Sequence, residues 1–121
     1  MPIPVTIADD SAMSRKMIKK ALPENWDIEL YEATNGREAL EAVQQGKADI
    51  LFLDLQMPVM TGYEVLENLH SHHDKTIVIV ISADIQPEAV AQVNALGAFR
   101  FLKKPLQPEH LKQTLHELGL L

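Results

Sequence analysis

The chain has 121 residues, 46% hydrophobic and 23% charged, so it is long enough for one folded domain and too apolar for a disordered chain. The absence of cysteine excludes disulfides, thiol catalysis and zinc sites built on thiolates. The net charge of −6 leaves no basic stripe for a nucleic-acid backbone, so we expect no direct contact with nucleic acid. The apolar runs are too short to span a bilayer, so we expect no contact with a membrane. We therefore expect one cytoplasmic domain over residues 1–121.

Short apolar segments alternate with amphipathic segments, a rhythm typical of repeated βα units around a parallel sheet. The predicted strands are Ile3–Ala8, Ile28–Ala33, Ile50–Leu53, Ile77–Ile81 and Phe99–Leu102. The third and fourth are continuously apolar, as expected when helices cover both faces, whereas the second and fifth include Glu29 and Arg100. Strands two and five should therefore be the edges of a doubly wound, five-stranded parallel sheet in the order 2-1-3-4-5. This predicts a flavodoxin-like α/β fold with three αβα layers.

The helices between these strands carry their own start signals. Two predicted capping boxes and two first-turn prolines mark them, at Asn35-Gly-Arg-Glu38, Thr61-Gly-Tyr-Glu64, Pro87 and Pro108. In the first helix, Met13, Met17 and Ala21 share one stripe, and we expect this stripe to face the core with the methionines as filler.

Polar side chains follow four of the strands at their carboxyl ends, where an open parallel sheet binds its ligands beside the reversal of strand order. They are Asp9 and Asp10 after strand one, Asp54 after strand three, Ser82 after strand four and Lys104 after strand five. Carboxylates that share one cleft raise each other's pKa unless a cation lies between them. Oxygen ligands with this charge favour Mg²⁺, with Mn²⁺ as a substitute.

We therefore predict a phosphoryl-transfer site in which Asp54 is the nucleophile. A divalent cation held by Asp9 and Asp10 would bridge Asp54 to a phosphoryl group. Lys104 and Ser82 would neutralise and orient the remaining phosphoryl oxygens.

The order of these residues resembles the receiver domain of two-component response regulators, the chemotaxis-regulator fold. The matching pieces cover essentially the whole chain: Asp9-Asp10, Leu-Phe-Leu-Asp-Leu-Gln-Met-Pro around Asp54, Gly62, Ser82-Ala83, Gly97-Ala98 and Lys104-Pro105. The resemblance implies that Asp54 accepts a phosphoryl group from a phosphohistidine on a sensor histidine kinase or a histidine phosphotransfer protein. It also implies that Asp9, Asp10, Asp54 and the backbone carbonyl of Gln56 hold Mg²⁺, and that the Lys104-Pro105 bond is cis.

The resemblance further implies a switch, in which Phe101 turns inward when Ser82 is drawn toward the phosphoryl group. Phosphorylation would then stabilise a conformation with a changed surface on the fourth helix, fifth strand and fifth helix. Gln56 and Asp84 would tune hydrolysis of the acyl phosphate. Such a domain is a signalling module that catalyses only its own phosphorylation and dephosphorylation. It acts on an output partner or a fused output domain, with phosphorylation-dependent dimerisation as one outcome.

Two other functions compete with this one. A non-phosphorylated receiver-like scaffold or dimerisation module would share the fold without using the chemistry. A haloacid-dehalogenase-type phosphatase also combines a strand-end Asp nucleophile with Ser, Lys and acidic metal ligands, but places the nucleophile on its first strand and the acidic pair late. Separately, the run His70-Ser-His-His-Asp74 is interpreted as a solvated helix end rather than a metal site.

Overall fold

Five parallel strands form one sheet in the order β2-β1-β3-β4-β5, as predicted. The computed structural model describes residues 2–121, and the strands are β1 (Ile3–Ala8), β2 (Ile28–Ala33), β3 (Ile50–Leu53), β4 (Ile77–Ser82) and β5 (Arg100–Lys103). Compared with the predictions, β4 extends one residue further and β5 begins and ends one residue later, because Ser82 pairs with Lys103 in the ladder. Their polar side chains do not end the pairing, which depends on backbone groups.

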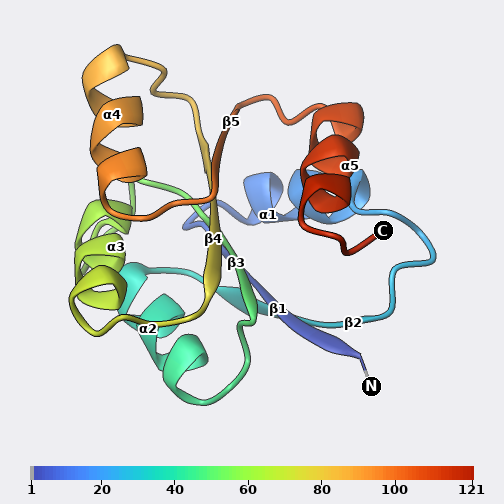
Figure 1. The fold of residues 1–121 in the computed structure, drawn as a ribbon, viewed down its shortest axis with the longest axis horizontal. Coiled ribbons are helices and arrows are strands. Elements are labelled where there is room, and N and C mark those ends of the chain that lie inside the picture. The colour runs from blue at the N-terminus through green and yellow to red at the C-terminus, as the bar shows by residue number, and fades with distance from the viewer. Residues whose placement is uncertain (1) are drawn as a thin grey trace.

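The helices cover both faces of the sheet and make three layers. They are α1 (Ala12–Ala21), α2 (Gly36–Gln44), α3 (Gly62–Ser71), α4 (Pro87–Ala95) and α5 (Pro108–Glu117). Figure 1 shows α1 and α5 on one side of the strands and α2, α3 and α4 on the other. The predicted doubly wound αβα architecture is therefore confirmed.

Two apolar cores lie on the two faces of the sheet, and the central strands contribute alternately to each. In β3, Leu51 and Leu53 pack with the α2–α4 side, whereas Ile50 and Phe52 pack with the α1 and α5 side. All four are buried. Because each fully buried side chain of this size contributes about 1.5–3 kcal/mol, β3 is anchored from both faces. The carboxyl end of β3, where Asp54 follows, is thereby held on a rigid element.

Helix caps fix where α2 and α3 begin. The predicted capping box of α3 is confirmed, since Thr61 Oγ1 accepts from Glu64 N at 3.2 Å and Glu64 Oε1 accepts from Thr61 N at 3.0 Å. The predicted box of α2 is half wrong. Asn35 Oδ1 accepts from Glu38 N, but Glu38 Oε1 accepts from the N–H and the hydroxyl of Thr34, both at 2.7 Å. Thr34 offers two donors to this carboxylate, where the Asn35 backbone offers one.

The predicted inward stripe of α1 is wrong at Met13 and Met17 and confirmed at Ala21. Met13 is 68% exposed and Met17 is 53% exposed, while Ile18 and Ala21 are buried. The helix is rotated so that Ser14, one turn before Ile18, faces the carboxyl end of β1, where its hydroxyl donates to Asp9. That contact and the burial of Ile18 set the rotation, and the two methionines are left at the surface.

The histidine-rich run lies at the carboxyl end of α3, where residues 70–74 are exposed, as predicted. The chain reverses there with His73 at φ 52°, and its N–H donates to the carbonyl of His70. Within residues 2–121, none of the helices has the length and apolar character needed to cross a bilayer.

Candidate functional site

Three carboxylates meet at the carboxyl ends of the neighbouring strands β1 and β3. Asp9, Asp10 and Asp54 each offer an oxygen, and these oxygens lie within 4.8 Å of one another. Asp9 and Asp54 are buried, whereas Asp10 is exposed. Oxygen donors of this charge can hold a hard divalent cation such as Mg²⁺, with the exposed side left for solvent or substrate.

The ammonium group of Lys104 lies between two of these carboxylates. Its Nζ is 2.8 Å from Asp9 Oδ2 and 3.3 Å from Asp54 Oδ2. The loop that carries it is held where Lys104 N donates to the carbonyl of Ser82, and the Lys104-Pro105 bond is cis, as expected. Burial acts to lower the pKa of Lys104, but the hydrogen bond to Asp9 and the charges of Asp54 and Asp9 outweigh it and raise the pKa. The lysine is therefore charged at neutral pH.

The environment of Asp54 favours a basic, partly desolvated carboxylate. Burial raises its pKa and the charge of Asp9 raises it further, while Lys104 opposes both effects. One oxygen, Oδ1, accepts from the N–H of Leu55 at 2.8 Å, and the other faces Lys104. The backbone is fixed where Asp54 N donates to the carbonyl of Ala8 in β1. Oδ2 is thus the Asp54 oxygen that shares the Lys104 ammonium group with Asp9.

Asp9 has supporting contacts that the sequence analysis missed. Ser11 N donates to its Oδ1 at 2.9 Å, the Ser14 hydroxyl donates to its Oδ2 at 2.5 Å, and Arg15 Nη1 donates to its backbone carbonyl at 2.7 Å. Arg15 Nε also donates to Glu32 on the neighbouring strand β2. The sequence did contain a signal for these contacts. Ser11 and Ser14 lie one turn apart at the start of α1, directly after the strand-end carboxylate of Asp9. The wrong stripe assigned to α1 concealed it.

The other predicted residues lie around this centre without joining it. Ser82 is buried at the end of β4, and its Oγ accepts from the N–H of Asp84 at 3.1 Å. Gln56 is exposed, and its N–H lies 3.5 Å from Asp54 Oδ1. Phe101 is partly buried against the core on the α2–α4 side. Within residues 2–121, no hydrogen bond links the side chains of Ser82, Gln56 or Asp84 to Asp54.

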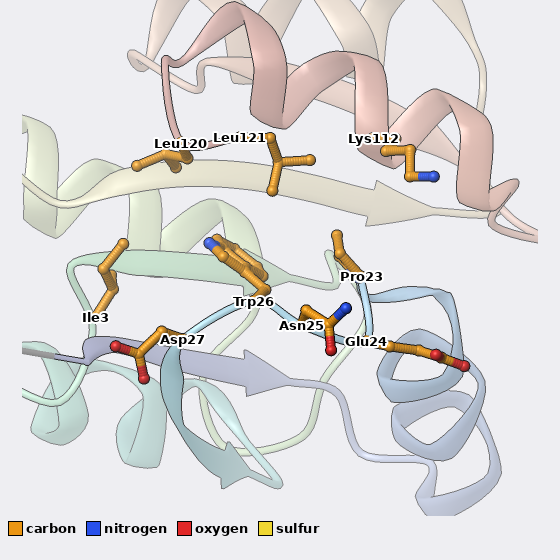
Figure 2. A pocket seen from close by; sticks show the side chains of 9 residues that line it. All are labelled: Ile3, Pro23, Glu24, Asn25, Trp26, Asp27, Lys112, Leu120 and Leu121. Atoms are coloured by element: carbon orange, nitrogen blue, oxygen red, sulfur yellow. The ribbon is translucent and has the colours of Figure 1, made fainter.

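A separate pocket lies near the amino ends of the strands, whereas Asp54 lies at their carboxyl ends. Trp26 lines it together with Leu120 and Leu121, and Figure 2 shows these side chains facing the same space. The Trp26 Nε1 atom is buried and has no hydrogen-bond partner within the part of the chain described. The grouped carboxylates lie at the opposite edge, so we place the candidate chemistry there.

Comparison with known proteins identifies the family to which this fold belongs. A sequence model described as the response regulator receiver domain matches residues 5–116, and the chain belongs to this family. Membership in the family decides against the haloacid-dehalogenase-type phosphatase. Domains of this family are modules of two-component signalling.

Individual relatives show how such a domain is used in different contexts. The chain is 34% identical over 115 residues to the chemotaxis protein CheY of Thermotoga maritima, covering 95% of this chain and 96% of that protein. It is 35% identical over 117 residues to the transcriptional regulatory protein BtsR of Escherichia coli strain K12, covering 96% of this chain but 48% of BtsR. The solved structure of Vibrio cholerae chemotaxis protein CheY4 superposes with a TM-score of 0.83 at 32% identity, covering 100% of both chains. The chain thus matches the whole of some relatives and about half of others.

Proposed function

We propose that this chain is a phosphoacceptor domain in which Asp54 takes a phosphoryl group from a phosphohistidine in a Mg²⁺-dependent reaction. The observation that carries the proposal is the grouping of the Asp9, Asp10 and Asp54 carboxylates, with the Lys104 ammonium between Asp9 and Asp54. Buried charges are expensive to maintain and contribute little net stability. A domain that served only as a scaffold would have no use for this arrangement.

The chemistry follows from the environment of Asp54. A carboxylate oxygen attacks the phosphorus atom, the bond from phosphorus to the histidine nitrogen breaks, and its electron pair leaves with the imidazole. Asp54 becomes an acyl phosphate. Partial desolvation raises the pKa of Asp54 and favours a reactive carboxylate, while Lys104, already 3.3 Å from its Oδ2, can neutralise a phosphoryl oxygen.

The donor set fits a hard cation. Asp9, Asp10 and Asp54 would hold Mg²⁺ together with the backbone carbonyl of Gln56, and Mn²⁺ would substitute. The bound ion would supply positive charge for the phosphoryl oxygens, as metal ions do in other phosphoryl-transfer sites.

We further propose that Ser82 and Phe101 transmit the change. Ser82 Oγ accepts one backbone N–H and keeps its own hydroxyl proton available for a phosphoryl oxygen. Phe101 lies partly exposed on the edge strand β5, which leaves it free to change its packing. The output would be a changed surface on α4, β5 and α5. Gln56 and Asp84, which border the site, would tune hydrolysis of the acyl phosphate.

The partners follow from the same site. A sensor histidine kinase or a histidine phosphotransfer protein would be the donor, and an apolar groove beside Lys104 supports a protein donor, since Met13, Met17 and Leu106 line it. Residues 1–121 would form one receiver domain, and this domain would act on an output partner or on a fused output domain. Dimerisation on phosphorylation is one form that the output would take.

The test is phosphorylation by a small donor. Purified protein is incubated with acetyl phosphate in Mg²⁺ or in EDTA and its intact mass is measured. We expect one added phosphoryl group in Mg²⁺, its loss on treatment with hydroxylamine, and none in EDTA. A protein that binds Mg²⁺ but never gains the group would favour the scaffold, and its assembly state would then be measured by light scattering.

A further inference from the structure

Within residues 2–121, the buried carboxylate of Asp9 accepts hydrogen bonds from three donors. Ser11 N donates to Oδ1, while the Ser14 hydroxyl at 2.5 Å and Lys104 Nζ at 2.8 Å both donate to Oδ2. Asp9 is only 1% exposed, so solvent does not replace a donor that leaves. Each of these contacts therefore determines how the carboxylate is held.

Among these donors, Lys104 also contacts Asp54. Its Nζ is already 3.3 Å from Asp54 Oδ2, and a phosphoryl group on Asp54 would bring further anionic oxygens to the same side. When the ammonium turns toward those oxygens, its hydrogen bond to Asp9 weakens. Among the described residues, the Ser14 hydroxyl is then the one donor left on Oδ2 of Asp9.

Ser14 is well placed to stay where it is. It lies in the first turn of α1, where its N–H donates to the hydroxyl of the N-cap Ser11 at 3.1 Å. The next residue, Arg15, connects the Asp9 carbonyl to Glu32 on β2. The hydroxyl therefore comes from a helix that is fixed at its start and tied to the sheet, and not from a loop.

We infer that Ser14 is a positioning residue that holds the Asp9 carboxylate in place for the divalent cation and allows Lys104 to move to the phosphoryl group. This inference rests on the proposed function. Hydrogen bonds to a metal-ligating carboxylate orient it, and their loss weakens metal affinity by about 10- to 100-fold. The effect is on metal binding and does not change the reacting atoms.

The test compares Ser14→Ala with Ser14→Thr, which keeps the hydroxyl, and with Ser71→Ala, a distant and exposed control. Mg²⁺ affinity is measured by titration calorimetry, and phosphorylation by acetyl phosphate is followed as a function of Mg²⁺ concentration. We expect Ser14→Ala to bind Mg²⁺ roughly tenfold more weakly. Its phosphorylation rate should recover at saturating Mg²⁺, while Ser14→Thr and Ser71→Ala keep wild-type affinity. Alanine favours the helix, so the variant should fold.

The outcomes separate the inference from the proposed function. Wild-type Mg²⁺ affinity in Ser14→Ala would overturn the inference, as would an equal loss in Ser14→Thr, because then the hydroxyl is not what matters. A rate that stays low at saturating Mg²⁺ would also overturn it. If the wild type itself neither binds Mg²⁺ nor is phosphorylated, the proposed function fails instead.

Discussion

Gly62 lies directly against the backbone of Asp54: a Cβ at residue 62 would be 2.2 Å from the Asp54 carbonyl oxygen and 2.8 Å from the Leu55 Cα. The first residue of α3 therefore packs on the chain segment that carries the proposed acceptor. No side chain fits there without moving backbone, because neither contact is with a flexible group.

Gly62→Ala should lower the free energy of unfolding by about 3 kcal/mol, since overpacking against fixed backbone forces a shift of the site. Gly46→Ala is the matched control. Gly46 has φ 75° but nothing within 4 Å of an added Cβ, so only the backbone strain of about 1 kcal/mol applies. Urea denaturation measures the stability of both variants, and equal losses of stability would contradict the close approach of Gly62 to the Asp54 backbone.

Lys104→Met tests the cation shared by the carboxylates. Without the ammonium, the charges of Asp9 and Asp54 oppose each other in a buried site, and we expect the free energy of unfolding in EDTA at pH 7 to fall by about 2 kcal/mol. Added Mg²⁺ should restore more stability to this variant than it gives the wild type. Lys103→Met, which alters the exposed neighbour, is the control. A similar loss in both variants would show that the shared cation is unimportant.

Val59 is strained in the loop between β3 and α3. It has φ 69° at the centre of a three-residue turn, in which Met60 N donates to the Pro58 carbonyl at 2.7 Å. Val59→Gly should therefore raise the free energy of unfolding by about 1 kcal/mol, since a β-branched residue is disfavoured there. Val59→Ala, which keeps a Cβ, should give a smaller increase in the free energy of unfolding. A glycine variant less stable than the wild type in urea would argue against strain.

The lowered pKa of Glu32 predicts that stability depends on pH. Hydrogen bonds from Lys19 and Arg15 lower the pKa of Glu32 below its ordinary value of 4.5. The contribution of these Glu32 interactions to the free energy of unfolding is therefore complete above pH 4.5 and is lost as the pH falls through the lowered pKa. With the Glu32 side chain 38% exposed, solvent screening keeps it below about 1 kcal/mol.

Glu32→Gln should accordingly be less stable than the wild type at pH 7, and the difference should shrink below pH 4.5. Thermal unfolding across this range measures it. Glu67→Gln, at an exposed position without an ion pair within residues 2–121, should show no such trend. A difference between Glu32→Gln and the wild type that persists unchanged at low pH would rule out the ion pair as its cause.

The fold was predictable because polarity marks the sheet edges. Glu29 and Arg100 distinguish the outer strands β2 and β5 from the continuously apolar β3 and β4, and right-handed crossovers then favour the strand order that the structure shows. The grouping of Asp9, Asp54 and Lys104 then follows, because strand ends of a parallel sheet meet at one edge.

The rotation of α1 was not predictable in the same way. Ala21 belongs both to the stripe through Met17 and to the stripe through Ile18, and periodicity alone does not choose between them. The choice is made by tertiary contacts, namely the burial of Ile18 and the hydrogen bond from Ser14 to Asp9. The error hid Ser14, whose hydroxyl donates to the proposed metal ligand Asp9. The partner of Glu38 was missed for a similar reason, since Thr34 and Asn35 compete for one carboxylate.

The central claim is that Asp54 is the phosphoryl acceptor, and intact-mass measurement of Asp54→Asn after incubation with acetyl phosphate and Mg²⁺ tests it most directly. The control is Asp49→Asn, an exposed residue just before β3 at the other end of that strand. We predict that the wild type and Asp49→Asn each gain one hydroxylamine-labile phosphoryl group, and that Asp54→Asn gains none. Equal phosphorylation of Asp54→Asn would contradict the account, because the acceptor would then be another residue.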